Sequence, residues 1–264
     1  MYNFNYQAPS SLTDAVNAIG AAEDGKLLAG GMTLIPTLKQ RLAQPSDLID
    51  LAKITELKGI KREGDTIIIG AMTTHAEVAA SDIVRGAIPA LAALAGDIGD
   101  AQVRHRGTIG GSICNNDPSA DYPSALVALG ATVTTDQRSL QAEDFFTGMF
   151  ETALELTEIV TSVSFPIPDK AAYMKFPNPA SRYAVVGVFV AKKGGTVRVA
   201  VTGAGPAVFR LPEFEQALAA SFTPDAVAGL KVPADGLNTD LHASAEYRAH
   251  LVTVMAKRAV AAIA

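Results

Sequence analysis

Two adjacent glycines, Gly30 and Gly31, end a short apolar run near the start of the chain, and they constrain its fold more than any other feature. Residues 26–29 before them are typical of a buried strand. Residues 33–42 have a helical pattern whose proline falls in the first turn, where it is tolerated. Residues 47–51 predict a second strand. Strand, glycine turn, helix and strand within about fifty residues indicate a compact βαβ-like unit.

The rest of the chain alternates between helical and strand patterns, which predicts an α+β protein. A capped amphipathic helix follows Ser11, and a hairpin is expected around residues 63–65, between strands at 57–62 and 66–71. Residues 96–121 are rich in Gly, Asp, Asn and Arg and predict a long polar loop. Further helices are expected at 76–80, 83–95, 123–129, 213–220 and 244–263, and further strands at 131–135, 159–165, 171–176, 183–191 and 196–202.

Composition and charge exclude several classes of protein. The formal net charge is -5 and Trp is absent, so we expect neither nucleic acid nor anionic lipid as a partner. The single cysteine, Cys114, cannot form an internal disulfide, a four-cysteine zinc site or an iron–sulfur cluster. The sequence shows no secretory signal pattern and no apolar run of about 18 residues, which predicts a cytoplasmic protein without membrane insertion.

The sequence carries none of the common catalytic or metal-binding patterns. The four histidines are far apart and lack metal-ligand spacing. Neither the G-x-S-x-G elbow of hydrolases nor the G-x-G-x-x-G loop of dinucleotide-binding Rossmann folds occurs. We therefore assign no catalytic residue and no metal ligand to this chain.

Two glycine-rich turns remain as candidate binding elements: residues 29–33, the first glycine turn, and residues 108–112, the second glycine turn. Adjacent glycines allow positive φ and let a ligand approach the main chain, because no Cβ is in the way. Successive N–H groups in such turns form an anion-binding concavity. A hydrogen bond to a charged group contributes about 1.5–3 kcal/mol, so about four or five such donors suffice to hold a pyrophosphate without a lysine.

Two long segments around these turns carry a family resemblance. LLAGGMTLIPTLKQRLAQPSDLIDL (residues 27–51) and IGDAQVRHRGTIGGSICNNDPSADYPSAL (residues 98–126) resemble the two flavin-binding motifs of the FAD subunit of molybdenum hydroxylases. This is the medium subunit of the carbon monoxide dehydrogenase, xanthine dehydrogenase and aldehyde oxidase family. The resemblance also covers FNYQAPSSLTDAV, IGAMTTHAEV and SAEYRAHLVTVMAKRAV, and so essentially the whole chain.

The resemblance implies a two-part FAD-binding domain of the p-cresol methylhydroxylase type, followed by a smaller C-terminal α+β domain. Pro166 and Pro168 mark the division, so we expect the FAD-binding domain at 1–167 and the C-terminal flavoprotein domain at 168–264. The FAD-binding domain would divide into subdomains at about 1–55 and 56–167. FAD would lie extended between these two subdomains.

The resemblance also implies which residues contact FAD. The pyrophosphate would lie on the two glycine turns, Ile98 near the flavin ring, and Asp121 in a hydrogen bond to the cofactor. Taken singly, Asp117 and Asp121 also fit as caps of local turns. Met32 and Ser112 depart from relatives that often carry a polar residue and Asn at these positions. The full set of expected contacts is Leu27, Leu28, Ala29, Gly30, Gly31, Met32, Thr33, Leu34, Ile98, Thr108, Ile109, Gly110, Gly111, Ser112, Asp117, Asp121, Val160 and Lys175.

The function implied by the resemblance is electron transfer within a larger complex. The chain would take electrons from the iron–sulfur clusters of a small partner subunit and pass them to an external acceptor. Substrate oxidation would occur on a large molybdopterin subunit, in a dimer of heterotrimers.

Two other readings remain open: a self-sufficient FAD-dependent oxidase or reductase, and a binding module that has lost FAD. The sequence names neither the substrate nor the final acceptor.

Overall fold

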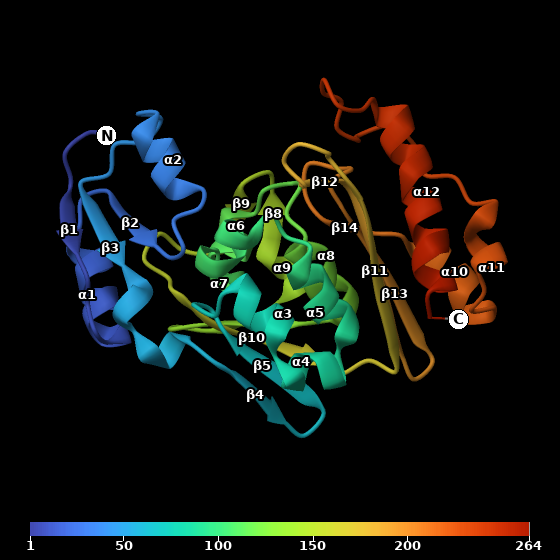
Figure 1. Cartoon of the computed structure of the whole chain (residues 1–264), viewed down its shortest axis with the longest axis horizontal. Helices are drawn as coiled ribbons and strands as arrows, with labels where there is room; N and C mark the ends of the chain where they lie inside the picture. Colours follow the sequence, from blue (N-terminus) through green and yellow to red (C-terminus); the bar gives the residue numbers. More distant parts are fainter. Residues whose placement is uncertain (264) are drawn as a thin grey trace.

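Residues 1–263 are described by a computed structural model, in which three large sheets follow one another from the N-terminal to the C-terminal end (Figure 1). The first sheet is parallel, with the order β1 (Asn5–Gln7), β3 (Asp47–Asp50), β2 (Gly25–Leu28). Helix α1 (Leu12–Ala21) precedes β2, and α2 (Leu34–Lys39) connects β2 to β3. The βαβ-like unit predicted from the first glycine turn is therefore confirmed.

The second sheet is antiparallel and lies in the middle of the molecule. Its strand order is β4 (Ile60–Glu63), β5 (Thr66–Gly70), β10 (Val160–Pro166), β6 (Thr132–Thr135), β7 (Ser139–Gln141). Six helices lie between β5 and β6 along the chain. They are α3 (His75–Ala80), α4 (Asp82–Ala87), α5 (Pro89–Gly96), α6 (Ala101–Arg106), α7 (Ile109–Asn115) and α8 (Tyr122–Leu129). The short α9 (Ala142–Phe145), β8 (Phe146–Gly148) and β9 (Glu151–Thr152) complete this part.

The third sheet has apolar side chains buried on both faces. Its antiparallel order is β11 (Lys170–Pro177), β12 (Ala184–Lys193), β13 (Thr196–Thr202), β14 (Phe209–Arg210). Side chains alternate across a strand. Phe189 and Ala191 accordingly join the core of the second sheet and its helices, while Val188 and Val190 pack toward the C-terminal helices. Those helices are α10 (Pro212–Ala220), α11 (Pro224–Ala228) and α12 (Ala245–Ala261), on the outer side of the sheet (Figure 1).

The prediction of a long polar loop over residues 96–121 is wrong, because α6 and α7 lie within it. Each helix is capped by the residue before it: Asp100 accepts from Val103 N at 2.8 Å, and Thr108 Oγ1 accepts from Gly111 N at 3.1 Å. The glycines of this segment lower its intrinsic helix propensity. The two short helices are stabilised instead by caps and by packing against the rest of the protein.

The expected divisions after residues 55 and 167 fall between sheets. The division after residue 167 separates the strands of the second sheet from those of the third, but it does not divide the hydrophobic core, because residues of β12 and β13 share a core with α5 and α8. We therefore keep the two-domain division as a proposal about the chain. No helix within residues 1–263 combines the length and apolar character needed to cross a bilayer.

Candidate functional site

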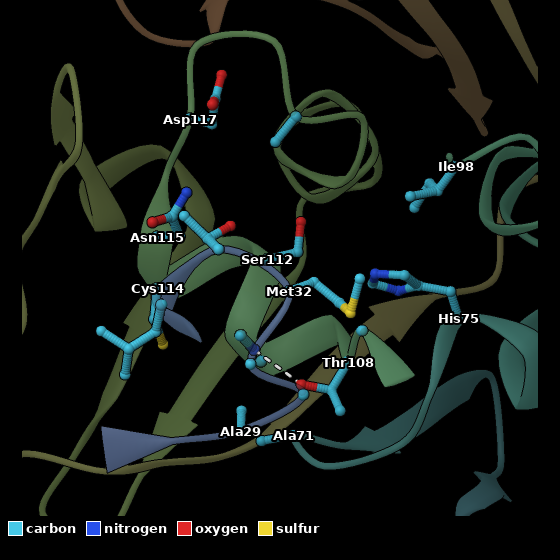
Figure 2. Close-up of a pocket in the computed structure, with 18 of the residues that line it drawn as sticks. Ala29, Met32, Ala71, His75, Ile98, Thr108, Ser112, Cys114, Asn115 and Asp117 are labelled. Carbon is cyan, nitrogen blue, oxygen red and sulfur yellow. Dashed lines mark hydrogen bonds between the residues drawn. The ribbon is translucent and has the colours of Figure 1, made fainter. Parts of the chain in front are cut away.

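One cavity of about 460 Å³ opens between the first glycine turn and the middle of the molecule (Figure 2). Its wall comes from segments far apart in sequence: the turn between β2 and α2, the start of α3, helices α6 and α7, and residues 181–183 before β12. Cavities that hold cofactors have volumes of roughly 300–1,000 Å³. The size and the convergence of these segments identify it as the candidate binding site.

The two glycine turns pack directly against one another at this cavity. A Cβ on Gly30 would lie 2.6 Å from the carbonyl carbon of Arg106 and 2.8 Å from Gly107 Cα. A Cβ on Gly111 would lie 3.3 Å from the Cβ of Ala29. Real Cβ atoms do not approach a backbone as closely as Gly30 requires, so that position must be glycine for the two turns to meet.

The two turns differ in the hydrogen-bonding capacity that they offer a ligand. Within residues 1–263, the backbone N–H groups of Gly30, Gly31, Met32 and Thr33 donate to no protein acceptor. Unpaired donors of this kind attract an anion.

In the second turn four of the five N–H groups are engaged, and only that of Thr108 donates to no protein acceptor within residues 1–263. Ile109 N donates to Thr73 O at 3.1 Å, Gly110 N to Ala71 O at 2.8 Å, and Gly111 N to Thr108 Oγ1. Ser112 N donates to Thr108 O at 3.0 Å. The expectation that both turns supply several free donors is thus wrong for residues 109–112 of the second turn, where only the N–H of Thr108 stays free.

The reason for glycine in the second turn also differs from the expectation. Among the paired glycines only Gly31 has a positive φ, of 75°, while Gly110 and Gly111 lie in the first turn of α7. A Cβ on Gly110 would lie 2.7 Å from both Ala71 O and Ala71 Cβ. Close packing of α7 against the end of β5, and not a left-handed backbone, requires glycine there.

Most of the expected contacts line the cavity together. They are Leu27, Ala29, Gly30, Gly31, Met32, Thr33, Leu34, Ile98, Thr108, Gly110, Gly111, Ser112, Asp117, Asp121 and Val160. Their convergence from both glycine turns, the end of α5 and β10 fits the extended ligand path that the resemblance implies.

Three of the expected contacts do not line the cavity. Leu28 packs with Leu38 and Leu48 in a small apolar cluster, because its side chain points to the opposite side of β2 from Leu27. Ile109 is fully buried in the main core. Lys175 lies behind the wall, where its ammonium is 3.1 Å from Asp121 Oδ1.

Several lining residues were missed by the sequence reading. They are Lys26, Leu51, Ala71, Met72, His75, Gly99, Val103, Gly107, Cys114, Asn115, Ala120, Leu154, Glu158, Ile159, Ser181, Arg182 and Tyr183. One readable signal existed for His75, because Thr74 and Glu77 form a capping box that fixes the start of α3. Nothing local predicts the others, since they reach the cavity only through the packing of the chain.

His75 is a buried neutral base in the cavity wall. Burial and the nearby Arg104 lower the pKa of His75 to about 4. Its ring lies 5.4 Å from that of Tyr122, between ring centroids, and Figure 2 shows it pointing toward Met32. Its Nδ1 is buried without a hydrogen-bond partner within residues 1–263. An unpaired buried polar atom at a cavity fits a site built for a bound group.

The lowered pKa of His75 predicts that the free energy of unfolding depends on pH. Below its ordinary pKa of 6.5 the unfolded chain protonates His75, while the folded chain leaves it neutral down to about 4. Stability is therefore lost as the pH falls through this window. Between about pH 7 and about pH 5 this residue should remove roughly 2 kcal/mol from the unfolding free energy.

Urea unfolding of the FAD-free chain at both pH values tests this expectation. The variant His75→Gln should lose this part of the pH dependence, while His250→Gln, at an exposed position on α12, serves as the matched control. An equal pH dependence in wild type and His75→Gln would show that His75 is protonated in the folded protein.

Asp121 brings a buried charge cluster to the cavity wall. The residue is only 4% exposed, and its Oδ1 accepts from Tyr173 Oη at 2.5 Å and from Lys175 Nζ at 3.1 Å. Lys175 Nζ also donates to Asp97 O at 2.8 Å. Burial raises the pKa of Asp121, and the Lys175 ammonium and the Tyr173 hydroxyl oppose that rise.

Glu158 is a second carboxylate among the lining residues, and its charge is compensated by more hydrogen bonds than that of Asp121. Its oxygens accept from Arg138 Nε and Nη2 at 2.9 Å each, and from Thr135 Oγ1 at 2.7 Å. These hydrogen bonds, that of Arg138 above all, lower the pKa of Glu158 to about 2. Glu158 is therefore ionised at neutral pH and fully paired, so its role at the wall is structural.

Comparison with known proteins relates this chain to a family. A family model described as the FAD binding domain in molybdopterin dehydrogenase matches residues 2–168. The medium chain of carbon monoxide dehydrogenase from Hydrogenophaga pseudoflava is 37% identical over 97% of this chain and 96% of its own length. The medium subunit of nicotine 6-hydroxylase from Paenarthrobacter nicotinovorans is 35% identical over 97% of this chain and 95% of its own length.

A solved structure supports the same relationship. It is carbon monoxide dehydrogenase from Hydrogenophaga pseudoflava in a form that lacks the Mo-pyranopterin moiety of the molybdenum cofactor. One of its chains matches this chain with a TM-score of 0.87 at 37% identity, over 98% of this chain and 96% of that one. The resemblance and the α+β fold expected from the sequence are confirmed.

Proposed function

Because the chain belongs to the family of FAD-binding domains in molybdopterin dehydrogenases, we propose that it is the electron-transferring flavoprotein subunit of a molybdenum-containing hydroxylase or dehydrogenase. It is the FAD component of an oxidoreductase complex, and FAD is its cofactor. The observation that supports this function best is the first glycine turn. Its residues Gly30 to Thr33, with four free N–H groups, line a cavity that residues of the second turn line as well.

The residues present fit this cofactor. The N–H groups of Gly30 to Thr33 would hold the negatively charged diphosphate, and no lysine is needed for that purpose. Asp121 offers a carboxylate to a hydroxyl or N–H of the cofactor, and the side chains of Ile98 and Val160 offer apolar surface to its rings. The remaining cavity-lining contacts expected from the sequence complete the binding surface.

The composition of the chain indicates which roles belong to FAD, which to this protein and which to partner subunits. Bound FAD supplies the capacity to accept and release electrons, and the protein binds it, orients it and sets the electrostatic field around it. Cys114 is the only cysteine of the chain, so iron–sulfur clusters that deliver electrons must reside on a partner. We propose an iron–sulfur small subunit and a molybdopterin large subunit as those partners, in a dimer of heterotrimers, with an external electron acceptor.

The substrate of the complex is chosen outside this chain. Two relatives of similar identity carry the names of enzymes that act on carbon monoxide and on nicotine. Chemically unlike substrates combined with one flavoprotein fold indicate that this subunit serves electron transfer and not substrate recognition. We further propose that the complex works in the cytoplasm.

Reconstitution of the purified chain with FAD tests the proposal. We expect one FAD per chain, measured by visible absorbance after removal of free flavin. Co-purification from the natural source should then recover an iron–sulfur and a molybdenum subunit. Turnover of a substrate by the isolated flavoprotein would instead support a self-sufficient oxidase or reductase, and a complex without flavin would support a module that has lost FAD.

A further inference from the structure

Two polar side chains of strand β11 in the third sheet lie behind the cavity wall, against Asp121. Tyr173 and Lys175 are two residues apart and therefore lie on one face of the strand. Both reach Oδ1 of Asp121, which directly precedes α8: the Tyr173 hydroxyl at 2.5 Å and the Lys175 ammonium at 3.1 Å. The C-terminal part of the chain thus fixes a residue that belongs to the cavity.

The structure makes room for the Tyr173 hydroxyl. Gly187 lies opposite Lys175 in the register of β11 and β12, and a Cβ on Gly187 would lie 3.0 Å from Tyr173 Cε2 and directly against its hydroxyl oxygen. The Tyr173 ring also stacks on Phe189, with centroids 6.1 Å apart and an angle of 29° between the ring planes. Ring and hydroxyl are therefore held in one place.

The consequence for Asp121 concerns its second oxygen. Oδ1 has two donors, while Oδ2 accepts no hydrogen bond from any group within residues 1–263. Asp121 lines the cavity and its side chain is 5% exposed. Because hydrogen bonds to one oxygen hold the carboxylate in a single orientation, its other oxygen is available to accept a hydrogen bond from a ligand that approaches from one direction.

We propose that Tyr173 is a positioning residue for cofactor binding: its hydroxyl orients Asp121 so that Oδ2 is available to an N–H or O–H of bound FAD. This inference rests on the proposed function, because it takes FAD to be the occupant of the cavity. Lys175 supplies a counter-charge that favours the ionised form of Asp121, and the Tyr173 hydroxyl fixes the orientation of the carboxylate.

The contacts of Asp121 also predict how the affinity for FAD depends on pH. The charged and titratable groups that face Asp121 are Tyr173 and Lys175 from β11, Asp97 after α5, Tyr122 of α8 and Tyr183 before β12. The hydrogen bond from Tyr173 lowers the pKa of Asp121, so its removal raises that pKa. If ionised Asp121 binds FAD, FAD affinity falls on acidification, and the fall begins at a higher pH once the hydroxyl is gone.

A double-mutant cycle on the FAD-free full chain tests the proposal. The affinity for FAD is measured by the quenching of flavin fluorescence, at each pH at which the chain remains folded. Tyr173→Phe keeps the ring and removes the hydroxyl. We expect about a tenfold weaker affinity near neutral pH and an acid midpoint moved to higher pH. In the background of Asp121→Asn the same change should have less than about a twofold effect. Tyr247→Phe, on the exposed side of α12, is the matched control and should bind FAD like wild type.

Gly187→Ala provides a second test that keeps the tyrosine, because the added methyl group displaces its hydroxyl from Asp121. It should weaken FAD binding in the same direction as Tyr173→Phe. The proposal is overturned if Tyr173→Phe binds like wild type, if its acid midpoint does not move, or if its effect is undiminished with Asp121→Asn. Absence of FAD binding by the wild-type chain would instead refute the proposed function.

Discussion

Gly30→Ala should weaken FAD binding by at least about a hundredfold, because the added methyl group forces the two glycine turns apart. The new Cβ would lie 2.6 Å from the carbonyl carbon of Arg106 and 2.8 Å from Gly107 Cα, and neither backbone atom can move independently of α6 and α7. Separation of the turns removes the free N–H groups of Gly30 to Thr33 from the cavity. Loss of two charge-assisted hydrogen bonds, at about 1.5–3 kcal/mol each, already accounts for the expected factor.

A matched control exists in the same part of the chain. Gly20 lies in α1, and a Cβ there would meet nothing within 4 Å, so Gly20→Ala should bind FAD like wild type. Isothermal titration of both FAD-free variants with FAD measures the difference, and circular dichroism checks that each is folded. Wild-type affinity in folded Gly30→Ala would mean that the contact between the turns does not shape the binding site.

Arg248→Met should lower the free energy of unfolding by about 3–4 kcal/mol. The Arg248 guanidinium is buried beneath α12, where Nη1 donates to Val185 O at 2.6 Å and to Gly203 O at 3.0 Å. Its Nη2 donates to Asp240 Oδ2 at 2.6 Å. Methionine fills part of the space but leaves these acceptors without donors, and buried unpaired groups cost about 1–3 kcal/mol each.

The same helix supplies the comparison for this prediction. Arg258 is exposed on α12, and Arg258→Met should change the unfolding free energy by less than about 0.5 kcal/mol. Urea unfolding of both variants near neutral pH measures the two values. Equal stabilities for Arg248→Met and wild type would show that Arg248 does not hold α12 to the sheet.

Some features of the site follow from local sequence because a short stretch contains all of their physical causes. Gly30 and Gly31 end an apolar strand and precede a helix, and this arrangement by itself predicts a turn; the second Gly-Gly pair and the family resemblance make it a candidate binding element. The Ser11 cap and the hairpin around residues 63–65 are likewise local, and both are present in the structure. Once a strand such as β11 is located, the two-residue period of its side chains also shows which residues share a face.

Other features lie outside what a local pattern can show. Residues 96–121 look like a loop because their glycines oppose helix formation, yet α6 and α7 form there: both helices are capped, and α7 also packs closely on Ala71 through Gly110. Nothing near Asp121 indicates that Tyr173 will donate to it, since the two are 52 residues apart. His75 gives no sign in sequence of the burial that lowers its pKa to about 4.

The sequence by itself determined the two glycine turns, the α+β fold class and, through its resemblance to known flavoproteins, FAD as the cofactor. The signal for each of these features lies within a short stretch of sequence, because backbone freedom and hydrophobic periodicity are properties of a few neighbouring residues. The tertiary structure alone decided that the first turn offers four free N–H groups while residues 109–112 offer none, and that two side chains of β11 contact Asp121. Hydrogen bonding and desolvation depend on which groups are in contact, and contacts between distant segments arise only when the chain packs into its tertiary structure.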